Sequence, residues 1–369
     1  MVWDDSGKEY VDCMAGYGVA IVGHCNPAVV ESIKRQSERL ITCHGSFYND
    51  ARGELLQKLN GVSPKGLEKA LLTNSGAESN EAAIKLARRH TGRKKIVSMM
   101  GGFHGKTFGA LSATWNKKYR EPFMPLLEHF DFARYGDAQS LEQLVDADTA
   151  AVIAEPIQGE TGVVVPPPDY FRQVREVCNR AGALLILDEI QTGLGRTGKM
   201  WASEHWGVVP DIMTVSKGLA GGIPFGAALT TREVMGSLKK GEHTSTFAGN
   251  PLACAAATAT LGFITERNLP TQAEAKGKIL KAGLLRIASA HRIVRDVRGM
   301  GLMLAAETRV DIHEALLGAL NEGVIFAYSG RETFRLLPPL VIDEGQIRRA
   351  LEVLEGVLTN EEERRARQN

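Results

Sequence analysis

The sequence predicts an α/β protein with a mostly parallel sheet and helices on both of its faces, followed by a smaller α+β region. Two observations lead to this prediction. Between residues 69 and 229, short apolar segments alternate with helical segments or loops. After Asn250, two long helical segments come first, and shorter strands and helices then alternate. With 369 residues, the chain can bury a large core and has room for about two domains.

The first half of the chain begins with two predicted helices. Pro27 is expected to open a helix that runs to about Leu40, because a helix needs no N–H donor at its first position. A second helix is expected at residues 51–59. A strand at 69–73, a tight loop NSGAES and a helix at 80–90 follow. Further strands are expected at 95–99, 150–154, 184–187, 212–215 and 225–229, with an amphipathic helix at 170–181.

The second half is expected to form the smaller α+β region. An Ala-rich helix at 251–266 is followed by another around 273–288. The charged tail EEERRARQN is expected to fray. Between them we expect strands at 294–298, 303–307 and 334–337 and helices at 312–322 and 345–358.

Composition and charge exclude several classes of protein. With 44 basic and 43 acidic residues, the formal net charge is +1, which argues against a nucleic-acid or anionic-membrane binder. No apolar run approaches the roughly 18 residues of a membrane span. The acidic start MVWDDSGKEYVD lacks the apolar core of a signal peptide, so we expect a cytoplasmic protein. The five cysteines form no CxxC pair, and we expect reduced thiols and no metal site.

The segment from Leu184 to Lys217 carries the strongest chemical signal. One apolar strand, LLILD, ends at Asp188, and a second, IMTV, is followed closely by Lys217. The carboxyl ends of neighbouring buried strands face one crevice, so these side chains are expected to meet there. A carboxylate can keep a ring nitrogen protonated, and a desolvated lysine can form a Schiff base with an aldehyde. Together they indicate pyridoxal phosphate as the cofactor.

Other residues near the strand ends support this interpretation. The small residues of SKGLAGG leave room for a bulky group beside Lys217. The loop at residues 74–77 precedes a helix, and its backbone N–H groups suit a phosphate. Phe103 could stack on a ring, and Gln191 could donate to its phenolic oxygen. Each feature also has a plain structural interpretation: a solvated strand end, a helix cap, a buried aromatic ring or an ion pair.

Two glycine-containing segments resemble nucleotide-binding motifs, but neither meets the requirements of its motif. Gly193–Gly198 fits GxGxxG, but the residues at 199–206 carry no clear helical apolar face, which argues against a dinucleotide. The Gly105-Lys106-Thr107 segment resembles the end of a P-loop. That motif requires a glycine where Met100 stands.

The motifs of this chain together resemble those of the class III aminotransferases, pyridoxal-phosphate enzymes of fold type I. The resemblance covers nearly the whole length, and the segment ATWNKKYREPFMPLLEHF is most similar to the carrier-protein-linked lysine/ornithine aminotransferases, close relatives of the acetylornithine aminotransferases. The matching motifs are GKEYVDCMAGYGVAIVGHCNP, NSGAESNEAAIKLAR, GGFHGKTFGALSAT, AEPIQGETGV, LDEIQTGLGRTG, SKGLAGGIPFGA, TSTFAGNPLACAAA and FRLLPPLVI.

The resemblance implies a role for each matching residue. Lys217 matches the Schiff-base lysine, and Asp188 matches the partner of the pyridinium nitrogen. The remaining cofactor contacts would come from Ser75, Gly76 and Ala77 at the phosphate, Phe103 and His104 at the ring, Gln191 near the phenolic oxygen, and Thr246, which would reach the phosphate in the neighbouring subunit.

The resemblance also implies that one site serves two substrates, an incoming amine and 2-oxoglutarate. Arg335 matches the arginine that clamps the glutamate carboxylate, a bidentate task. Glu160 matches an acid that pairs with this arginine when no carboxylate is present, so the pair would act as a gate. A plain structural salt bridge is the alternative. Tyr17 and Tyr48 match aromatic residues on the substrate side.

One departure from the family concerns the amino donor. The family commonly has arginine in FHGRT, where Lys106 stands here, and lysine keeps the charge but loses the planar fork. We therefore expect an ω-aminotransferase that acts on lysine or ornithine linked to a small acidic carrier protein, in lysine or arginine biosynthesis. N-acetylornithine is the alternative donor. A 4-aminobutyrate-type transaminase and a pyridoxal-phosphate enzyme of another reaction type are further alternatives.

The resemblance implies an obligate homodimer with shared sites. In each chain we expect an N-terminal segment (1–45) packed with the small domain, a large cofactor-binding domain (46–250) and a small domain (251–369) that begins with a connecting helix. Related enzymes usually carry a helix before the first motif, so a segment is expected to be missing at the start.

Overall fold

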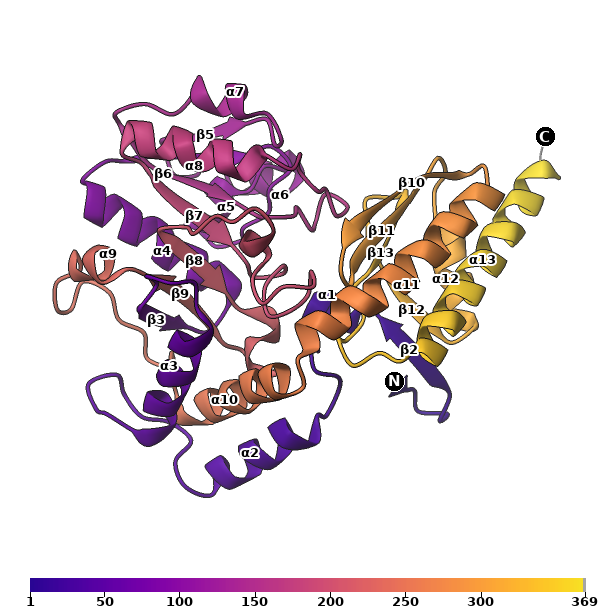
Figure 1. Cartoon of the computed structure of the whole chain (residues 1–369), viewed down its shortest axis with the longest axis horizontal. Coiled ribbons are helices and arrows are strands. Elements are labelled where there is room, and N and C mark those ends of the chain that lie inside the picture. The colour runs from indigo at the N-terminus through magenta and orange to yellow at the C-terminus, as the bar shows by residue number, and fades with distance from the viewer. Residues whose placement is uncertain (368–369) are drawn as a thin grey trace.

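In the computed structural model, which describes residues 1–367, the chain folds around two β-sheets (Figure 1). Within this range the larger sheet has seven strands in the order β3-β9-β8-β7-β6-β4-β5. Strands β8 to β5 pair in parallel, and β9 runs antiparallel to both of its neighbours. The strands are β3 (Lys69–Thr73), β4 (Lys95–Met99), β5 (Phe130–Ala133), β6 (Thr149–Ala154), β7 (Leu184–Asp188), β8 (Ile212–Val215) and β9 (Gly226–Thr230).

Alternate side chains of this sheet pack on opposite helices, because successive residues of a strand point to opposite faces. In β6, Val152 packs in a cluster with helix α8 (Tyr170–Ala181), whereas Ile153 packs in a cluster with helix α4 (Gly76–Thr91). The sheet is therefore covered on both faces, and this confirms the predicted α/β arrangement (Figure 1). Shorter helices complete this region: α5 (Phe108–Ala113), α6 (Lys117–Arg120), η1 (Glu121–Phe123), α7 (Ala138–Glu142), η2 (Ala202–His205), η3 (Lys217–Ala220) and α9 (Arg232–Gly236).

The smaller sheet joins the two ends of the chain. Its order is β1-β2-β12-β13-β11-β10, and the N-terminal strand β2 pairs in parallel with β12. Helices α11, α12 and α13 pack against this sheet (Figure 1). The elements are β1 (Val2–Trp3), β2 (Glu9–Cys13), β10 (Val294–Met300), β11 (Met303–Thr308), β12 (Val324–Ser329), β13 (Thr333–Leu336), α11 (Leu269–Ala290), α12 (His313–Asn321) and α13 (Glu344–Ala366).

Helix α10 (Pro251–Glu266) packs against α2 (Pro27–Ser37), α3 (Asp50–Val62) and η3 rather than against the smaller sheet (Figure 1). Asn250 caps α10 by accepting a hydrogen bond from the N–H of Ala253 at 2.8 Å. Pro251 then occupies the first helical position. The predicted bounds of this helix agree with the structure.

The GxGxxG segment connects the two regions. Gly193–Gly198 forms turns, and no α-helix follows it directly in the described chain. Arg196 within it is fully buried, and its guanidinium donates to the carbonyl oxygens of Leu302, at 3.1 Å, and Pro338. Burial lowers the pKa of Arg196 to about 9. This segment therefore ties the larger region to the smaller one through Arg196.

Three sequence predictions about helices need correction. Helix α2 ends at Ser37, before Leu40. Helix α4 begins at Gly76, so most of the predicted loop NSGAES is its first turn, capped by Ser75. Helix α13 continues to Ala366 rather than ending at residue 358 in a frayed tail. The helix extends through its last described turns, where Glu361 is buried and accepts hydrogen bonds from Arg364 and Arg365.

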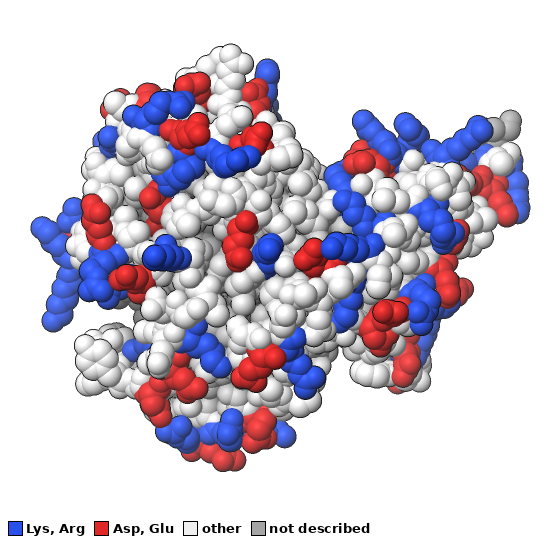
Figure 2. All heavy atoms as spheres, in the orientation of Figure 1, with Lys and Arg blue, Asp and Glu red and all other residues white. Residues whose placement is uncertain are grey.

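The surface charges, the helices and the cysteines of the described residues point to no further kind of site. Lysine, arginine and acidic residues are interspersed over the face in Figure 2, in keeping with the net charge of +1. Within residues 1–367, no helix combines the length and apolar character needed to cross a membrane. In the same range, no three His, Cys, Asp or Glu side chains are grouped as metal ligands would be. The five cysteines are free thiols, and three of them are buried.

Candidate active site

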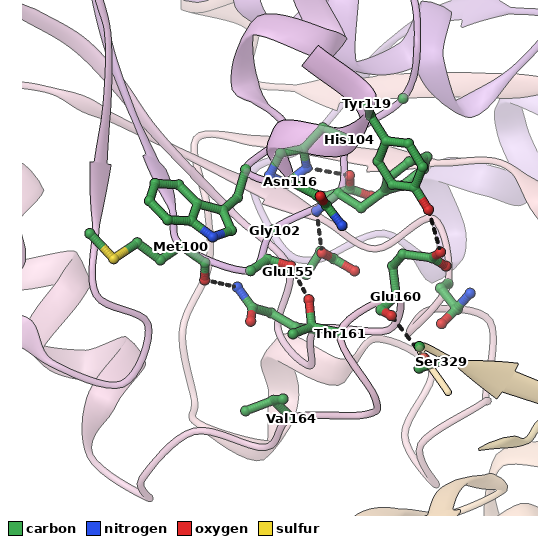
Figure 3. Close-up of a pocket in the computed structure, with 18 of the residues that line it drawn as sticks. Met100, Gly102, His104, Asn116, Tyr119, Glu155, Glu160, Thr161, Val164 and Ser329 are labelled. Carbon is green, nitrogen blue, oxygen red and sulfur yellow. Dashed lines mark hydrogen bonds and ion pairs between the residues drawn. The ribbon is translucent and has the colours of Figure 1, made fainter. Parts of the chain in front are cut away.

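A cleft of about 1620 Å³ opens at the carboxyl ends of the parallel strands (Figure 3). Loops after β4, β6, β7 and β8 line it, together with the start of α4. The smaller sheet contributes residues 328–333, and the N-terminal segment contributes Tyr17. Ligands of open α/β sheets bind at this edge, where loops from several strands converge. The cleft therefore gathers residues from distant parts of the chain, from Tyr17 to Thr333.

Lys217 and Asp188 lie on neighbouring strands at this edge, as predicted. Asp188 is the last residue of β7 and lies opposite Thr214 of β8 in the register, and Lys217 begins η3 just beyond β8. Lys217 has a φ of 38°, in the left-handed region that costs a residue with a side chain about 1 kcal/mol or more. Burial lowers the pKa of the Lys217 ammonium to about 8, with Arg335 acting in the same direction.

Asp188 is buried and held by three donors. Its Oδ2 accepts from Asn80 Nδ2 at 2.8 Å and lies 2.8 Å from His104 Nδ1, while its Oδ1 accepts from the N–H of Ile190 at 3.1 Å. Asn80 is anchored in turn, because its Oδ1 accepts from Thr214 Oγ1 at 2.8 Å and its Nδ2 also donates to the carbonyl of His104. This network fixes the orientation of the carboxylate before any ligand binds.

The start of α4 forms one wall of the cleft. Ser75 Oγ accepts from the N–H of Glu78 at 3.2 Å, whereas Gly76 and Ala77, the first two helical residues, line the cleft. Their N–H groups have no acceptor within the helix, and the helix dipole adds partial positive charge there. Gly76 packs closely on Ile190, because a Cβ would come within 2.9 Å of Ile190 Cδ1 and the isoleucine side chain would have to move. This end of the cleft suits a phosphate group.

Phe103 and Gln191 lie on two other walls of the cleft. The ring of Phe103 packs edge-on against Tyr119, with centroids 5.8 Å apart. Gln191 donates from Nε2 to the carbonyl of Tyr17 at 3.4 Å. Its Oε1 is buried and has no hydrogen-bond partner among the described residues, and the same holds for His104 Nε2. Both atoms remain available to a ligand.

Glu155 is a site residue that the sequence reasoning missed. It lies just after β6 and is buried, and its two carboxylate oxygens accept from the N–H groups of Phe103, at 2.9 Å, and Gly159, at 3.0 Å. Burial raises the pKa of this carboxyl to about 7. The rule that identified Asp188, an acid at the end of an apolar strand, applies equally to Glu155. Asn80, Ile190 and Tyr119 were also missed.

The structure brings Arg335 and Glu160 together. Arg335 on β13 is fully buried, its Nη1 donates to the carbonyl of Gly159 at 2.6 Å, and the same atom is 3.5 Å from Glu160 Oε2. The guanidinium lies 5.1 Å from the ring centroid of Tyr17. Tyr17 adopts a left-handed backbone conformation with φ of 58°, which places its ring in the cleft. Burial lowers the pKa of Arg335, and Glu160 opposes this shift.

Lys106 lies near this pair through Tyr119. Its Nζ is 4.6 Å from the ring centroid of Tyr119, a cation–π contact. The Tyr119 hydroxyl donates to Glu160 Oε1 at 3.1 Å (Figure 3). The lysine that departs from the family pattern is thus linked to Arg335 through two residues, Tyr119 and Glu160.

Two predicted site residues lie away from the cleft of their own chain. Tyr48 is fully exposed, and Thr246 is exposed on the loop before α10. Neither lines the cleft in the part of the chain that the structure describes. Ser245, next to Thr246, accepts a hydrogen bond from Asn74 Nδ2 at 3.2 Å, so this loop lies beside the residue that precedes the cap of α4.

Comparison with known proteins identifies the family. The family model described as aminotransferase class-III matches residues 1–358. The chain belongs to the class III aminotransferases. It is 48% identical over 360 residues to an acetylornithine aminotransferase of Methanopyrus kandleri, and the match covers 97% of this chain and 92% of that relative.

Other relatives and solved structures agree with this assignment. A LysW-aminoadipate semialdehyde/glutamate semialdehyde transaminase of Sulfurisphaera tokodaii is 42% identical over 98% of this chain and 94% of its own length. The ornithine aminotransferase of Toxoplasma gondii has a similar structure, with a TM-score of 0.95 and 34% identity over 99% of this chain and 89% of that one.

Class III aminotransferases depend on pyridoxal phosphate, and the cleft of this family member fits the cofactor. The start of α4 offers free N–H groups for its phosphate. Asp188 offers an oriented carboxylate for the ring nitrogen, and Gln191 and His104 contribute unpartnered buried atoms. Lys217 offers an amine whose lowered pKa favours the neutral, nucleophilic form.

Proposed function

We propose that this aminotransferase transfers the terminal amine of lysine or ornithine, linked to a carrier protein, to 2-oxoglutarate. The observation that carries the proposal is that Lys217, Asp188 and Glu160 line a single cleft, and that Arg335 lies buried behind its wall, 3.5 Å from Glu160. Lys217 and Asp188 support chemistry at an amine-bearing carbon. The Arg335–Glu160 pair supports recognition of two substrates that differ by a carboxylate next to that carbon.

Lys217 and Asp188 perform the central chemistry in this proposal. Bound pyridoxal phosphate supplies a reactive aldehyde and a ring that withdraws electrons from the substrate carbon. Lys217 would hold the cofactor, and its Nζ would then move a proton to and from the amine-bearing carbon of the substrate. Asp188, oriented by Asn80 and His104, would keep the ring nitrogen protonated. The backbone N–H groups of Gly76 and Ala77, beside the cap residue Ser75, would hold the phosphate, and Phe103 would pack on the ring.

Arg335 and Glu160 would select between the two substrates. Glutamate carries a carboxylate beside the reacting amine, and the planar guanidinium of Arg335 can bind it in bidentate fashion. A terminal-amine donor presents only methylene groups there, and Glu160 would then neutralise the buried arginine. Leaving a buried charge without a partner costs several kcal/mol, on the order of 3–5, so one of the two carboxylates is required in either state.

The rim of the cleft favours a donor on an acidic carrier. Lys106, which lacks the fork needed to bind a carboxylate in bidentate fashion, lies at this rim. The relative from Sulfurisphaera tokodaii is named for a LysW-linked substrate, as are relatives from Sulfolobus acidocaldarius and Deinococcus radiodurans. Acidic residues at the rim are Glu160 and Glu332, whereas the exposed basic residues lining it are Lys106, Lys117, Lys118, Arg134 and Arg331.

N-acetylornithine is the second candidate donor. The Methanopyrus kandleri relative, at 48% identity, is named acetylornithine aminotransferase. This donor carries a single free carboxylate, which Lys106 could bind as a point charge. Both donors need the same catalytic residues, so the preference for one donor depends on contacts at the rim of the cleft.

A side-by-side rate measurement distinguishes the donors. We expect kcat/KM to be at least about tenfold higher for carrier-conjugated lysine or ornithine than for N-acetylornithine or free ornithine. We also expect the carrier-linked rate to fall with ionic strength, because salt screens attraction between a basic rim and an acidic carrier. A higher kcat/KM for N-acetylornithine, with no salt dependence for the carrier-linked donor, would replace our proposal with the second candidate.

We further propose that the chain forms a homodimer through a surface that contains Tyr48. Arg52 ties the segment that carries Tyr48 to the segment that carries Thr246, because its guanidinium donates to the carbonyls of Cys43, Phe47 and Gly249 at 2.9–3.0 Å. The two segments together expose a patch of large apolar side chains, which is typical of interaction surfaces. The patch comprises Leu40, Ile41, Phe47, Tyr48 and Phe247.

A further inference from the structure

Tyr119 lies between the residues proposed for donor binding and those proposed for glutamate binding. It belongs to helix α6 and lines the cleft, half-buried. Its hydroxyl donates to Glu160 Oε1 at 3.1 Å, and its ring lies beneath the ammonium of Lys106, with the Nζ 4.6 Å from the ring centroid. Figure 3 shows the hydroxyl pointing at the Glu160 carboxylate. The tyrosine thus contacts a residue from each of the two groups, Lys106 and Glu160.

The Glu160 carboxylate is held more closely by Tyr119 than by Arg335. The hydrogen bond to the tyrosine is 3.1 Å long, whereas the nearest guanidinium nitrogen is 3.5 Å from Glu160 Oε2. Arg335 is fully buried, and its Nε and Nη2 have no hydrogen-bond partner among residues 1–367. Two nitrogens of the guanidinium therefore have no partner even with Glu160 beside it, so Glu160 alone does not satisfy Arg335.

A substrate carboxylate at Arg335 creates an electrostatic problem for Glu160. Two carboxylates would then share one guanidinium at short distance, and like charges in a partly desolvated site repel strongly. Glu160 must either leave the site or keep another hydrogen-bond donor and another cation close by. Tyr119 offers the donor, and the ammonium of Lys106 above its ring offers the cation.

We propose that Tyr119 is the second partner of Glu160, a positioning residue that lets Arg335 accept a dicarboxylate. When a substrate carboxylate binds Arg335, Glu160 keeps its hydrogen bond to Tyr119 and turns toward Lys106. When the donor amine binds, Glu160 returns to Arg335. This inference rests on the proposed roles of Arg335 and Glu160, and it adds a residue that controls the balance between the two substrates.

The environment of the phenol is consistent with this role. Burial, and next the charge of Glu160, raise the pKa of Tyr119 above its usual value of 10.0. The hydroxyl therefore keeps its proton throughout the neutral range and remains a hydrogen-bond donor. The residues that face it include the acid Glu160 and the base Lys106, with Phe103 on the edge of the ring.

Replacing Tyr119 by phenylalanine tests the proposal without an activity assay. The Tyr119→Phe variant keeps the ring for Lys106 and Phe103 and removes the hydroxyl alone. Glutarate, a dicarboxylate without an amine, serves as the probe, and calorimetry gives its Kd for the holoenzyme. We expect the Kd to rise about tenfold, because in the free enzyme Glu160 also has Arg335 as a partner, whereas in the bound state the hydrogen bond to Tyr119 must stabilise more of its charge. The KM for 2-oxoglutarate should rise similarly, and the KM for the donor should stay constant or fall.

Two further variants separate this inference from the proposal on which it rests. Arg335→Ala should abolish glutarate binding; unchanged binding would mean that the gate itself is wrong. If Arg335→Ala abolishes binding but Tyr119→Phe changes neither the glutarate Kd nor either KM, the gate stands and the role of Tyr119 is wrong. In the Glu160→Gln background, the Tyr119→Phe change should alter the Kd by less than about twofold, because no charge remains to stabilise. A full tenfold effect there would also overturn the role.

Discussion

Lys217 carries a destabilising charge in the folded protein when no cofactor neutralises it. Burial lowers the pKa of its ammonium from 10.5 to about 8, so folding releases a proton between these two pH values. Because the unfolded chain binds this proton more tightly, stability rises with pH from about 8 to 10.5. Below about pH 8 the ammonium is charged in both states, and its burial lowers the free energy of unfolding by the full amount.

The Lys217→Met variant of the apoprotein should therefore melt at a higher temperature than the unchanged apoprotein at neutral pH. The advantage should shrink as the pH rises through the window from about 8 to 10.5. Thermal denaturation over a pH series checks this, with Lys94→Met, an exposed lysine outside the cleft, as the control. A difference in Tm that is the same at every pH would contradict the proposed cost.

Lys106 is expected to act on the donor more than on 2-oxoglutarate. It lies at the rim of the cleft and contacts Tyr119 rather than Arg335. Lys106→Ala should raise the donor KM several times more than the KM for 2-oxoglutarate, and steady-state kinetics with both substrates varied measures the two effects. Lys94→Ala should change neither. Equal increases in both KM values would rule out a donor-specific role.

At the scale of single residues, the residues at strand ends could be predicted from the sequence, whereas side-chain contacts between distant segments could not. Asp188 and Lys217 follow apolar strands, so their meeting was predictable. Glu155 follows β6 in the same way and could have been found by the same rule. The contact of Tyr119 with Glu160 joins helix α6 to the loop after β6, 41 residues further along the chain, and no local pattern marks it.

Helix η3 positions Lys217 through a close contact that only glycine permits. Gly218 packs so tightly on the N-terminal segment that a Cβ would lie 2.8 Å from Ile21 Cβ. The small residues after Lys217 were predicted to leave room for the cofactor. At two of these positions the prediction was wrong, because the space belongs to other side chains. Ile21 occupies it at Gly218, and Val29 and Thr260 occupy it at Gly221.

The Gly218→Ala variant should consequently unfold more easily and bind the cofactor less tightly. Overpacking of this kind costs about 1–3 kcal/mol, and the shift of η3 would displace Lys217. Denaturant unfolding and titration with pyridoxal phosphate measure the two effects. Gly236→Ala is the matched control, because a Cβ there meets nothing within 4 Å. Similar behaviour of the two variants would show that the contact with Ile21 is dispensable.

At the scale of elements, the strongly patterned segments were predictable. Strands β3, β4 and β8 and helices α8 and α10 have the predicted bounds, because each is an apolar or amphipathic run closed by clear ends. Strand β2 was missed because its partner β12 lies about 310 residues further along the chain, and β12 was missed with it. The first turn of α4 was missed because glycine and serine also form loops.

The whole molecule places the two sheets on either side of the cleft. Arg196 ties the larger region to the smaller one, and Arg335 extends from the smaller sheet to contact Gly159 and the cleft residue Glu160. The α/β class and the change of pattern near Asn250 were predictable from the alternation of segments. The joining of the N-terminal strand to the C-terminal sheet was predictable only from family resemblance, since its partners are distant in sequence.

The apolar patch around Phe47 should mediate self-association if the proposed dimer is correct. Replacing Phe47 and Phe247, both 67% exposed, by serine should weaken the dimer, because each replacement removes apolar surface that the interface would bury. Sedimentation velocity over a range of protein concentrations measures the change. Val209→Ser, at another exposed apolar position, is the control. A monomer for the unchanged protein, or an unaltered dimer for the double variant, would contradict the proposed interface.

The central claim is that one cleft serves two substrates through the Arg335–Glu160 pair. Rapid-mixing absorbance of the bound cofactor follows the two half-reactions separately, one with glutamate and one with the donor amine. In Arg335→Ala, the glutamate half-reaction should slow by roughly 30-fold or more, because a buried charge partner of the carboxylate is lost. The donor half-reaction should stay within about threefold of the unchanged enzyme. Equal slowing of both half-reactions would contradict the account.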